Sequence, residues 1–130
     1  MYIKNFDDWG VVKKVINKEE RKINVRKGEI RWVSFGVNIG MEIDGKGDTF
    51  LRPALIIDCV GSGIALVIPI TSGIKKYPGY FSFPWKDHTD SLCIHHIKSI
   101  STKRILKRAG KISEGRLREI KDHIKKFYSL

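Results

Sequence analysis

The chain has 130 residues, 42% of them hydrophobic and 30% charged, a composition that excludes general disorder and predicts one folded domain. Its net charge of +11 is expected to attract a polyanion, an anionic membrane surface or an acidic protein, although lysines that serve only solubility would give the same count. Apolar runs such as residues 54–57 are too short to cross a membrane, and Cys59 and Cys93 are interpreted as free thiols, so a cytoplasmic protein is expected.

Residues 1–26 are predicted to form an added helix followed by a charged connector. Asp7 is the predicted N-cap, and Phe6 and Val11 are predicted to pack together as a hydrophobic staple. Apolar residues at roughly helical spacing follow, at Trp9, Val12, Val15 and Ile16. We interpret this segment as a packing element without chemistry, separate from the domain at residues 27–130.

Residues 28–100 are rich in short apolar segments that predict strands. The predicted strands are residues 28–36, 51–58, 64–70, 80–83 and 91–94. A long glycine-rich loop, residues 38–49, separates the first two, and a polar turn is expected at residues 85–90. No long helix lies between the segments, so the sequence predicts a mainly β chain with helices (α+β), built as a small antiparallel barrel.

Residues 98–130 change in character. Residues 101–106 are predicted to form one or two helical turns that stop at Gly110, and Ser113 is predicted to cap a final helix. One face of that helix carries the apolar residues Leu117, Ile120 and Ile124. The segment contains eleven basic and three acidic residues. A polyanion-binding surface and a merely solvated helix face explain this charge equally well.

The sequence has no pattern for a metal site, a phosphate-binding glycine loop or an activated serine, so most enzyme classes lack support. Metal-free cleavage of RNA needs none of these, because RNA supplies its own nucleophile, the 2′-hydroxyl. Glu42 is a candidate general base, the Arg52 guanidinium can bind two phosphate oxygens, and the Thr71 hydroxyl can donate to one. The alternatives are a plain loop residue for Glu42, a surface salt bridge for Arg52 and a strand end for Thr71.

Several short motifs occur in an order typical of a known toxin family. They are residues 27–33, 40–42, 52–57, 68–72, 97–101, 104–105 and 110–113. Over residues 27–128 the chain resembles the PemK/MazF family of type II toxin–antitoxin systems. The resemblance implies an SH3-like barrel of the CcdB/PemK type with a C-terminal helix, a homodimer, and an endoribonuclease that cleaves single-stranded RNA at specific sequences. The implied products are a 2′,3′-cyclic phosphate and a 5′-hydroxyl, formed without metal or cofactor.

The same resemblance assigns roles to individual residues. Arg52 and Thr71 match catalytic residues of the family, and Glu42 matches an acid that some members place near the scissile phosphate. The residues expected to contact RNA are Ser72, Lys75, Lys76, Tyr77, His96 and Lys98. His96 replaces a glutamine common in the family, and on a strand it would face away from His95. Candidate base-stacking aromatics are Phe50, Tyr77, Tyr80 and Trp85.

The expected protein partner is an acidic, partly disordered antitoxin that competes with RNA for a basic groove. Two alternatives stay open: a non-catalytic nucleic-acid- or protein-binding module of the same fold, and a gyrase poison of the CcdB type. Arg52 and Thr71 argue against the first, and the sequence of residues 126–130 gives no positive support to the second.

Overall fold

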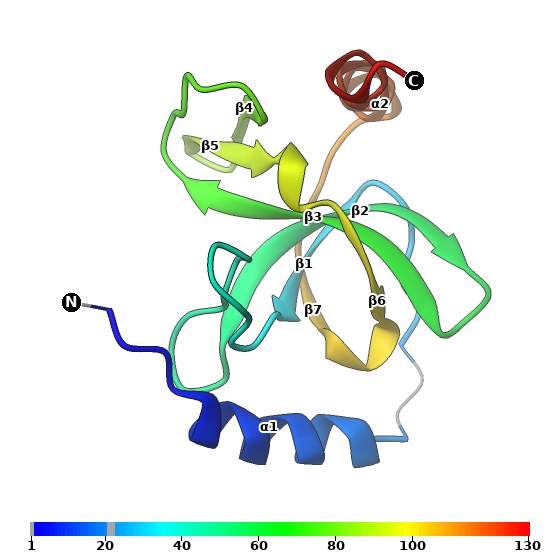
Figure 1. Cartoon of the computed structure of the whole chain (residues 1–130). Coiled ribbons are helices and arrows are strands. Elements are labelled where there is room, and N and C mark those ends of the chain that lie inside the picture. The colour runs from blue at the N-terminus through cyan, green and yellow to red at the C-terminus, as the bar shows by residue number, and fades with distance from the viewer. Residues whose placement is uncertain (1, 21–22) are drawn as a thin grey trace.

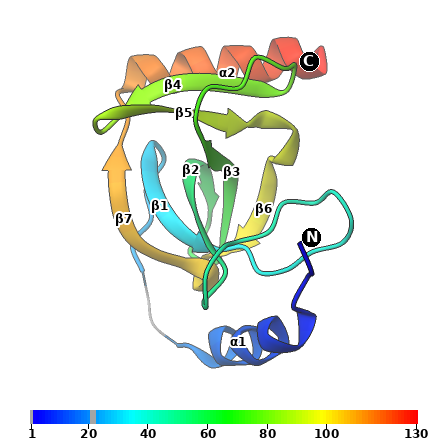
Figure 2. The same cartoon turned by 90° about the vertical axis from the view of Figure 1, so that its left-hand side faces the viewer.

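The computed structural model describes residues 2–20 and 23–130, so residues 21 and 22 of the predicted connector lie outside the described residues. The elements in chain order are α1 (Phe6–Lys18), β1 (Glu29–Ser34), β2 (Leu51–Val60), β3 (Ile64–Ser72), β4 (Tyr80–Trp85), β5 (His88–Cys93), the 3-10 turn η1 (Ile94–His96), β6 (Lys98–Ser101), the 3-10 turn η2 (Thr102–Arg104), β7 (Ile105–Lys111) and α2 (Glu114–Tyr128). Figures 1 and 2 show α1 and α2 at opposite ends of the molecule with the strands between them. Neither helix of the described part is long and apolar enough to span a membrane.

The strands form one bent antiparallel sheet in the order β4-β5-β3-β2-β1-β7, and β6 pairs with β3. β3 is the central strand: residues 64–67 pair with β6, and residues 70–72 pair with β5. Within the described chain, no ladder joins β4 to β7, so the sheet stays open rather than closing on itself. The predicted α+β class, with an antiparallel sheet and a helix at each end, is confirmed.

The core has two parts because side chains on β1, β2 and β3 alternate between the two faces of the sheet. Ile30, Leu55 and Ile68 lie in one apolar cluster, which Leu117 and Ile120 of α2 complete. The intervening residues form the second cluster, which contains Val33, Phe35, Ala54, Ile56, Ala65, Val67, Ile100 and Ile105. Both faces of these strands are therefore buried, which explains their nearly continuous apolar sequences.

The predicted cap of the last helix is confirmed. The Ser113 side chain accepts a hydrogen bond of 3.1 Å from the amide of Arg116, and α2 begins at the next residue, Glu114. The prediction for α1 is wrong in its details. Asn5, not Asp7, caps α1, because its side chain accepts a hydrogen bond of 3.0 Å from the amide of Asp8.

The predicted hydrophobic staple is also wrong, because Phe6 and Val11 are both exposed. Trp9 is the residue that fixes α1 to the rest of the chain. It is only 6% exposed and packs in a small cluster with Val37 and Phe50. The rings of Trp9 and Phe50 meet edge to face, with 5.6 Å between their centroids.

The prediction of helical turns at residues 101–106 is wrong except for the single turn η2. β6 pairs with β3, and β7 pairs with β1, where Gly110 lies opposite Ile30. Gly110 therefore lies inside a strand rather than ending a helix. Pairing with strands already present in the sheet overrides the weak local preference of this segment. β5 likewise begins earlier than predicted, at His88, inside the expected turn.

Candidate active site

The loop of residues 36–50, between β1 and β2, folds around Asp44. The Asp44 side chain is buried, and its Oδ1 accepts a hydrogen bond of 2.6 Å from the amide of Asn38. A Cβ at Gly45 would lie 1.6 Å from the carbonyl oxygen of Phe50, so only glycine permits this close return of the chain. The loop therefore places Asp44 against the start of β2.

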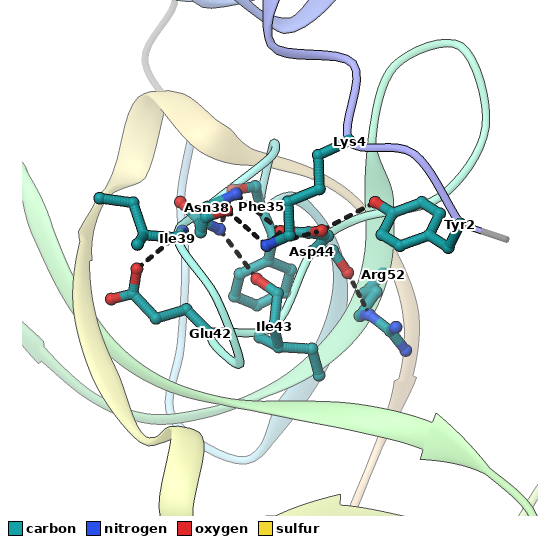
Figure 3. A network of polar contacts seen from close by, with 9 residues as sticks. All are labelled: Tyr2, Lys4, Phe35, Asn38, Ile39, Glu42, Ile43, Asp44 and Arg52. Carbon is teal, nitrogen blue, oxygen red and sulfur yellow. Dashed lines mark hydrogen bonds and ion pairs between the residues drawn. The ribbon is translucent and has the colours of Figure 1, made fainter.

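Arg52 lies at the start of β2, opposite Val33 of β1. Its Nε donates a hydrogen bond to the backbone carbonyl of Asp44. Figure 3 shows the two terminal nitrogens of the guanidinium pointing away from that carbonyl. Across residues 2–20 and 23–130, no group accepts a hydrogen bond from these two nitrogens. A half-buried guanidinium held through Nε and open at its outer edge is suited to bind two oxygens of one anion.

Thr71 and Ser72 end β3, where they pair with Ser91 and Asp90 of β5. Together with Arg52 they line a hollow of about 670 Å³, which we call the Thr71 hollow. Two of the three residues expected to be catalytic, Arg52 and Thr71, thus line one hollow although they come from different strands. The Thr71 hollow also contains Trp85, a candidate base-stacking residue whose Nε1 donates a hydrogen bond of 2.7 Å to Asp90.

Glu42 lines a second hollow of about 650 Å³, which we call the Glu42 hollow. Its Oε1 accepts a hydrogen bond of 2.9 Å from the amide of Ile39, a contact within the loop (Figure 3). The two hollows share Lys46, Gly47 and Arg52. Arg52 therefore stands on the boundary between them, with Glu42 on one side and Thr71 on the other.

His96 lies in η1 rather than on a strand, so the prediction that it faces away from His95 is wrong. The two imidazole rings lie side by side, with 4.4 Å between their centroids. Burial lowers the pKa of His96, the charges of His95, Arg52 and Lys98 lower it further, and Glu42 acts in the opposite direction. Burial also lowers the pKa of Lys98, again against the influence of Glu42. His96 and Lys98 thus lie within electrostatic range of the Glu42 hollow.

The other residues expected to contact RNA lie outside both hollows. Lys75, Lys76 and Tyr77 form an exposed turn between β3 and β4. Two of the candidate stacking residues are packed against neighbouring rings. Phe50 is 9% exposed and packs against Trp9. The Tyr80 ring and the His95 imidazole pack edge to face, with 4.9 Å between their centroids.

Sequence reasoning missed several residues that line the hollows. The Thr71 hollow includes Trp32, Lys46, Lys86 and His88, and the Glu42 hollow includes the segment Tyr2, Ile3, Lys4 and Asn5. Trp32 could have been found from strand pairing, because it lies opposite Pro53, next to Arg52. No local pattern marks the segment before α1, since its contacts are with residues about forty positions away.

The two cysteines are free thiols, as expected. Burial raises the pKa of Cys93 to about 11, so this thiol is protonated at neutral pH and is a poor nucleophile. Within the described ranges, no three His, Cys, Asp or Glu side chains are grouped as a metal site would require.

The family of this chain was identified by comparing its sequence with models of known protein families. The model of the PemK-like, MazF-like toxin of type II toxin–antitoxin systems matches residues 26–128. The chain belongs to this family. The match includes both strands and the loop that hold Glu42, Arg52 and Thr71, and it begins after α1.

Solved structures of MazF-type proteins have the same fold as this family member. MazF from Deinococcus radiodurans is 20% identical, with a TM-score of 0.68 over 83% of this chain and 99% of that one. The MazE–MazF complex from the same organism is 18% identical, with a TM-score of 0.61 over 83% and 98%. An endoribonuclease in complex with its cognate antitoxin, from a mycobacterial species, is 12% identical, with a TM-score of 0.60 over 82% and 97%. Comparison with curated protein sequences finds no match.

Proposed function

We propose that this PemK/MazF-family toxin is an endoribonuclease that cleaves single-stranded RNA at specific sequences without a metal ion. The observation that carries the proposal is the position of Arg52. Arg52 lines both hollows, one of which also contains Glu42 and the other Thr71, and the outer edge of its guanidinium is open. A solved protein of the same fold is described as an endoribonuclease, which supports the same activity.

The proposed reaction uses the 2′-hydroxyl of RNA as the nucleophile. The Glu42 carboxylate takes the proton of that hydroxyl, and its oxygen attacks the adjacent phosphorus. The O2′–P bond forms while the P–O5′ bond breaks, and the leaving 5′-oxygen takes a proton from water. Arg52 and Thr71 donate hydrogen bonds to the non-bridging oxygens, whose negative charge grows in the transition state. The products are a 2′,3′-cyclic phosphate and a 5′-hydroxyl.

The proposed RNA path follows the two joined hollows. Lys46, Arg52 and Lys86 line them and supply positive charge for the phosphates. Trp85 lines the Thr71 hollow and offers an aromatic surface for a base. His96 lines neither hollow, and its lowered pKa favours the neutral imidazole, so it adds little charge beside this path.

The proposal includes a cognate antitoxin that neutralises the enzyme by placing an acidic segment in the same hollows. Two solved neighbours are complexes of a toxin with its antitoxin, which supports such a partner. A homodimer is also proposed, on the family resemblance alone, and light scattering of the purified protein tests it.

The deciding experiment incubates the purified protein with a long single-stranded RNA in excess chelator, with Arg52→Ala as the matched variant. Discrete fragments ending in a cyclic phosphate, absent with Arg52→Ala, are expected, and their ends give the recognition sequence. Loss of cleavage in chelator that magnesium restores would contradict the metal-free mechanism. RNA that is bound but never cut, across substrates containing every short sequence, would identify the protein as a binding module instead.

A further inference from the structure

The segment Tyr2–Asn5 forms part of the wall of the Glu42 hollow, which Glu42 and Arg52 also line. This segment lies outside the region that matches the toxin family, which begins at residue 26. It comes directly before α1, the element that the sequence suggests has no chemistry. Its position raises the question of what it contributes to a site built by the rest of the chain.

Asp44 holds the segment in place through its side chain (Figure 3). The Tyr2 hydroxyl donates a hydrogen bond of 2.7 Å to Asp44 Oδ2, and Lys4 Nζ lies 3.3 Å from the same oxygen. Lys4 also donates a hydrogen bond to the carbonyl of Asn38. The hydrogen bond to Asp44 raises the pKa of Tyr2, which keeps its hydroxyl protonated and able to donate.

A second anchor lies at the other end of the segment. Asn5 caps α1, and Trp9, one turn later, is buried against Val37 and Phe50. The segment Tyr2–Asn5 is therefore fixed to the domain on both sides, by Asp44 and by Trp9. Fixing a side chain before a ligand arrives lowers the entropy that binding must overcome.

Tyr2 and Arg52 both donate hydrogen bonds to Asp44. The side chain of Asp44 accepts from the Tyr2 hydroxyl, while its backbone carbonyl accepts from Arg52 Nε. Although its hydroxyl is bonded, Tyr2 is 68% exposed, so much of its ring surface is open to solvent. Tyr2 and Arg52 line the same hollow, and Figure 3 shows both side chains on one side of Asp44.

We propose that Tyr2 is a base-stacking residue for the RNA substrate. The base next to the phosphate held by Arg52 stacks on the exposed face of the Tyr2 ring. A fixed aromatic ring beside an arginine with an open edge is the combination that single-stranded RNA requires, a stacking surface for a base and a cation for the phosphate. This inference rests on the proposed function, and it assigns substrate binding to a segment that lies outside the family match.

Stacking on an aromatic face is tolerant of base identity, because every base has a flat apolar face. Tyr2 therefore contributes affinity rather than the choice of cleavage sequence. Removing the ring is expected to weaken binding of all substrates by a similar factor, while the sequence that is cut stays the same.

The experiment measures the dissociation constant of an RNA that carries the cleavage sequence with a 2′-deoxy sugar at the cleaved nucleotide, so that it binds without reacting. The variants are Tyr2→Ala, Tyr2→Phe and Phe6→Ala. Phe6 is the matched control because it is an exposed aromatic four residues away that does not line the Glu42 hollow. Single-turnover cleavage of the all-ribose RNA separates binding from the chemical step.

Tyr2→Ala is expected to raise the dissociation constant about 10-fold, within the range for loss of one base–aromatic stack, with little change in the single-turnover rate at saturation. Tyr2→Phe keeps the ring and is expected to stay within about 2-fold of the wild type, since only the hydrogen bond is lost. Phe6→Ala is expected to match the wild type.

Equal affinity of Tyr2→Ala and Phe6→Ala would overturn the inference while leaving the proposed function intact. Tighter binding by Tyr2→Ala would also overturn it, because the segment would then block the hollow. Equal losses in Tyr2→Ala and Tyr2→Phe would assign the effect to the Asp44 hydrogen bond and overturn stacking. A wild-type protein that neither binds nor cuts RNA would overturn the proposed function and the inference together.

Discussion

The indole of Trp9 lies against the backbone of Gly36 so closely that a Cβ at position 36 would be 2.1 Å from Trp9 Cε2. Gly36 also has a φ of +76°, in the region that favours glycine. The attachment of α1 to the domain therefore depends on the absence of a side chain at one position of the loop that carries Asp44.

We expect Gly36→Ala to be more destabilising than Gly40→Ala. Gly40 has a φ of +55°, and a Cβ added there would have no atom within 4 Å. Gly40→Ala therefore costs only the free energy of a left-handed backbone conformation, about 1–2 kcal/mol. Gly36→Ala adds the collision with Trp9. Urea unfolding measures both free energies. In a Trp9→Ala background, itself less stable by about 3–5 kcal/mol, the two alanine substitutions are expected to cost the same. A persistent excess at position 36 would show that Trp9 is not its cause.

Asp44→Ala is expected to lower the free energy of unfolding by about 2–3 kcal/mol, because it removes the acceptor of the Asn38 amide and of the Tyr2 hydroxyl and one of the two partners of Lys4. Hydrogen exchange measured by mass spectrometry is expected to lose protection in residues 36–50, whose amides are hydrogen-bonded in the loop. Glu42→Ala is the control and is expected to lose less, since its side chain accepts only a local hydrogen bond. Unchanged protection of residues 36–50 in Asp44→Ala would mean that other contacts hold the loop.

Burial of Asp44 by itself would raise its pKa, but the hydrogen bonds from Tyr2, Asn38 and Lys4 outweigh burial and lower it. A carboxyl whose pKa is lower in the folded state stabilises the fold above its unfolded pKa of about 3.9, and this contribution is lost as pH falls through the lowered value. In Asp44→Asn the stability difference from wild type is therefore expected to shrink as the pH falls below about 4. A difference that stays constant well below pH 4 would contradict a lowered pKa for Asp44.

At position 71 the hydroxyl, not the side-chain volume, is expected to matter for cleavage. Thr71→Val keeps the shape but loses the donor, and it is expected to reduce the single-turnover rate by about 10²-fold or more, as loss of one transition-state donor does. Thr71→Ser keeps a hydroxyl and is expected to stay within about 10-fold of wild type. Equal rates for Val and Ser would remove the hydroxyl from the mechanism.

The pKa of His96 is lowered by burial, so the unfolded chain binds a proton at a higher pH than the folded protein does. The free energy of unfolding is therefore expected to decrease as pH falls from the ordinary value of 6.5 toward the lowered one, with the full stability present at neutral pH and above. His96→Gln is expected to flatten this part of the curve of stability against pH. An unchanged slope in the variant would assign the dependence to other groups.

The salt dependence of RNA affinity shows whether RNA binds along the two hollows or on the basic face of α2. Lys46→Ala or Lys86→Ala is expected to reduce the slope of log affinity against log salt by about 0.7, the value for one phosphate contact on a single strand. Lys125→Ala, on the exposed face of α2, is expected to leave the slope unchanged. A loss of slope in Lys125→Ala alone would place the RNA on α2.

The central part of the fold could be predicted from the sequence because β1, β2 and β3 carry their apolar residues in unbroken or alternating runs. β6 and β7 could not, because they are short and polar and are strands only through pairing with β3 and β1. The positions of Arg52 and Thr71 followed from the family motifs. Tyr2 could not be found in this way, because its place next to Arg52 depends on Asp44, 42 residues later.

β3 pairs with β2, β5 and β6, and one of its partners changes within a single step: Pro69 lies opposite Ala54 of β2, whereas the next residue, Ile70, pairs with Leu92 of β5. Arg52 lies on β2 two residues before Ala54 and pairs with Val33 of β1, whereas Thr71 lies in the ladder between β3 and β5. The relative position of the Arg52 cation and the Thr71 hydroxyl therefore depends on how β3 passes from β2 to β5. On the proposed mechanism, a substitution at Pro69 is expected to change the rate of cleavage without altering either residue.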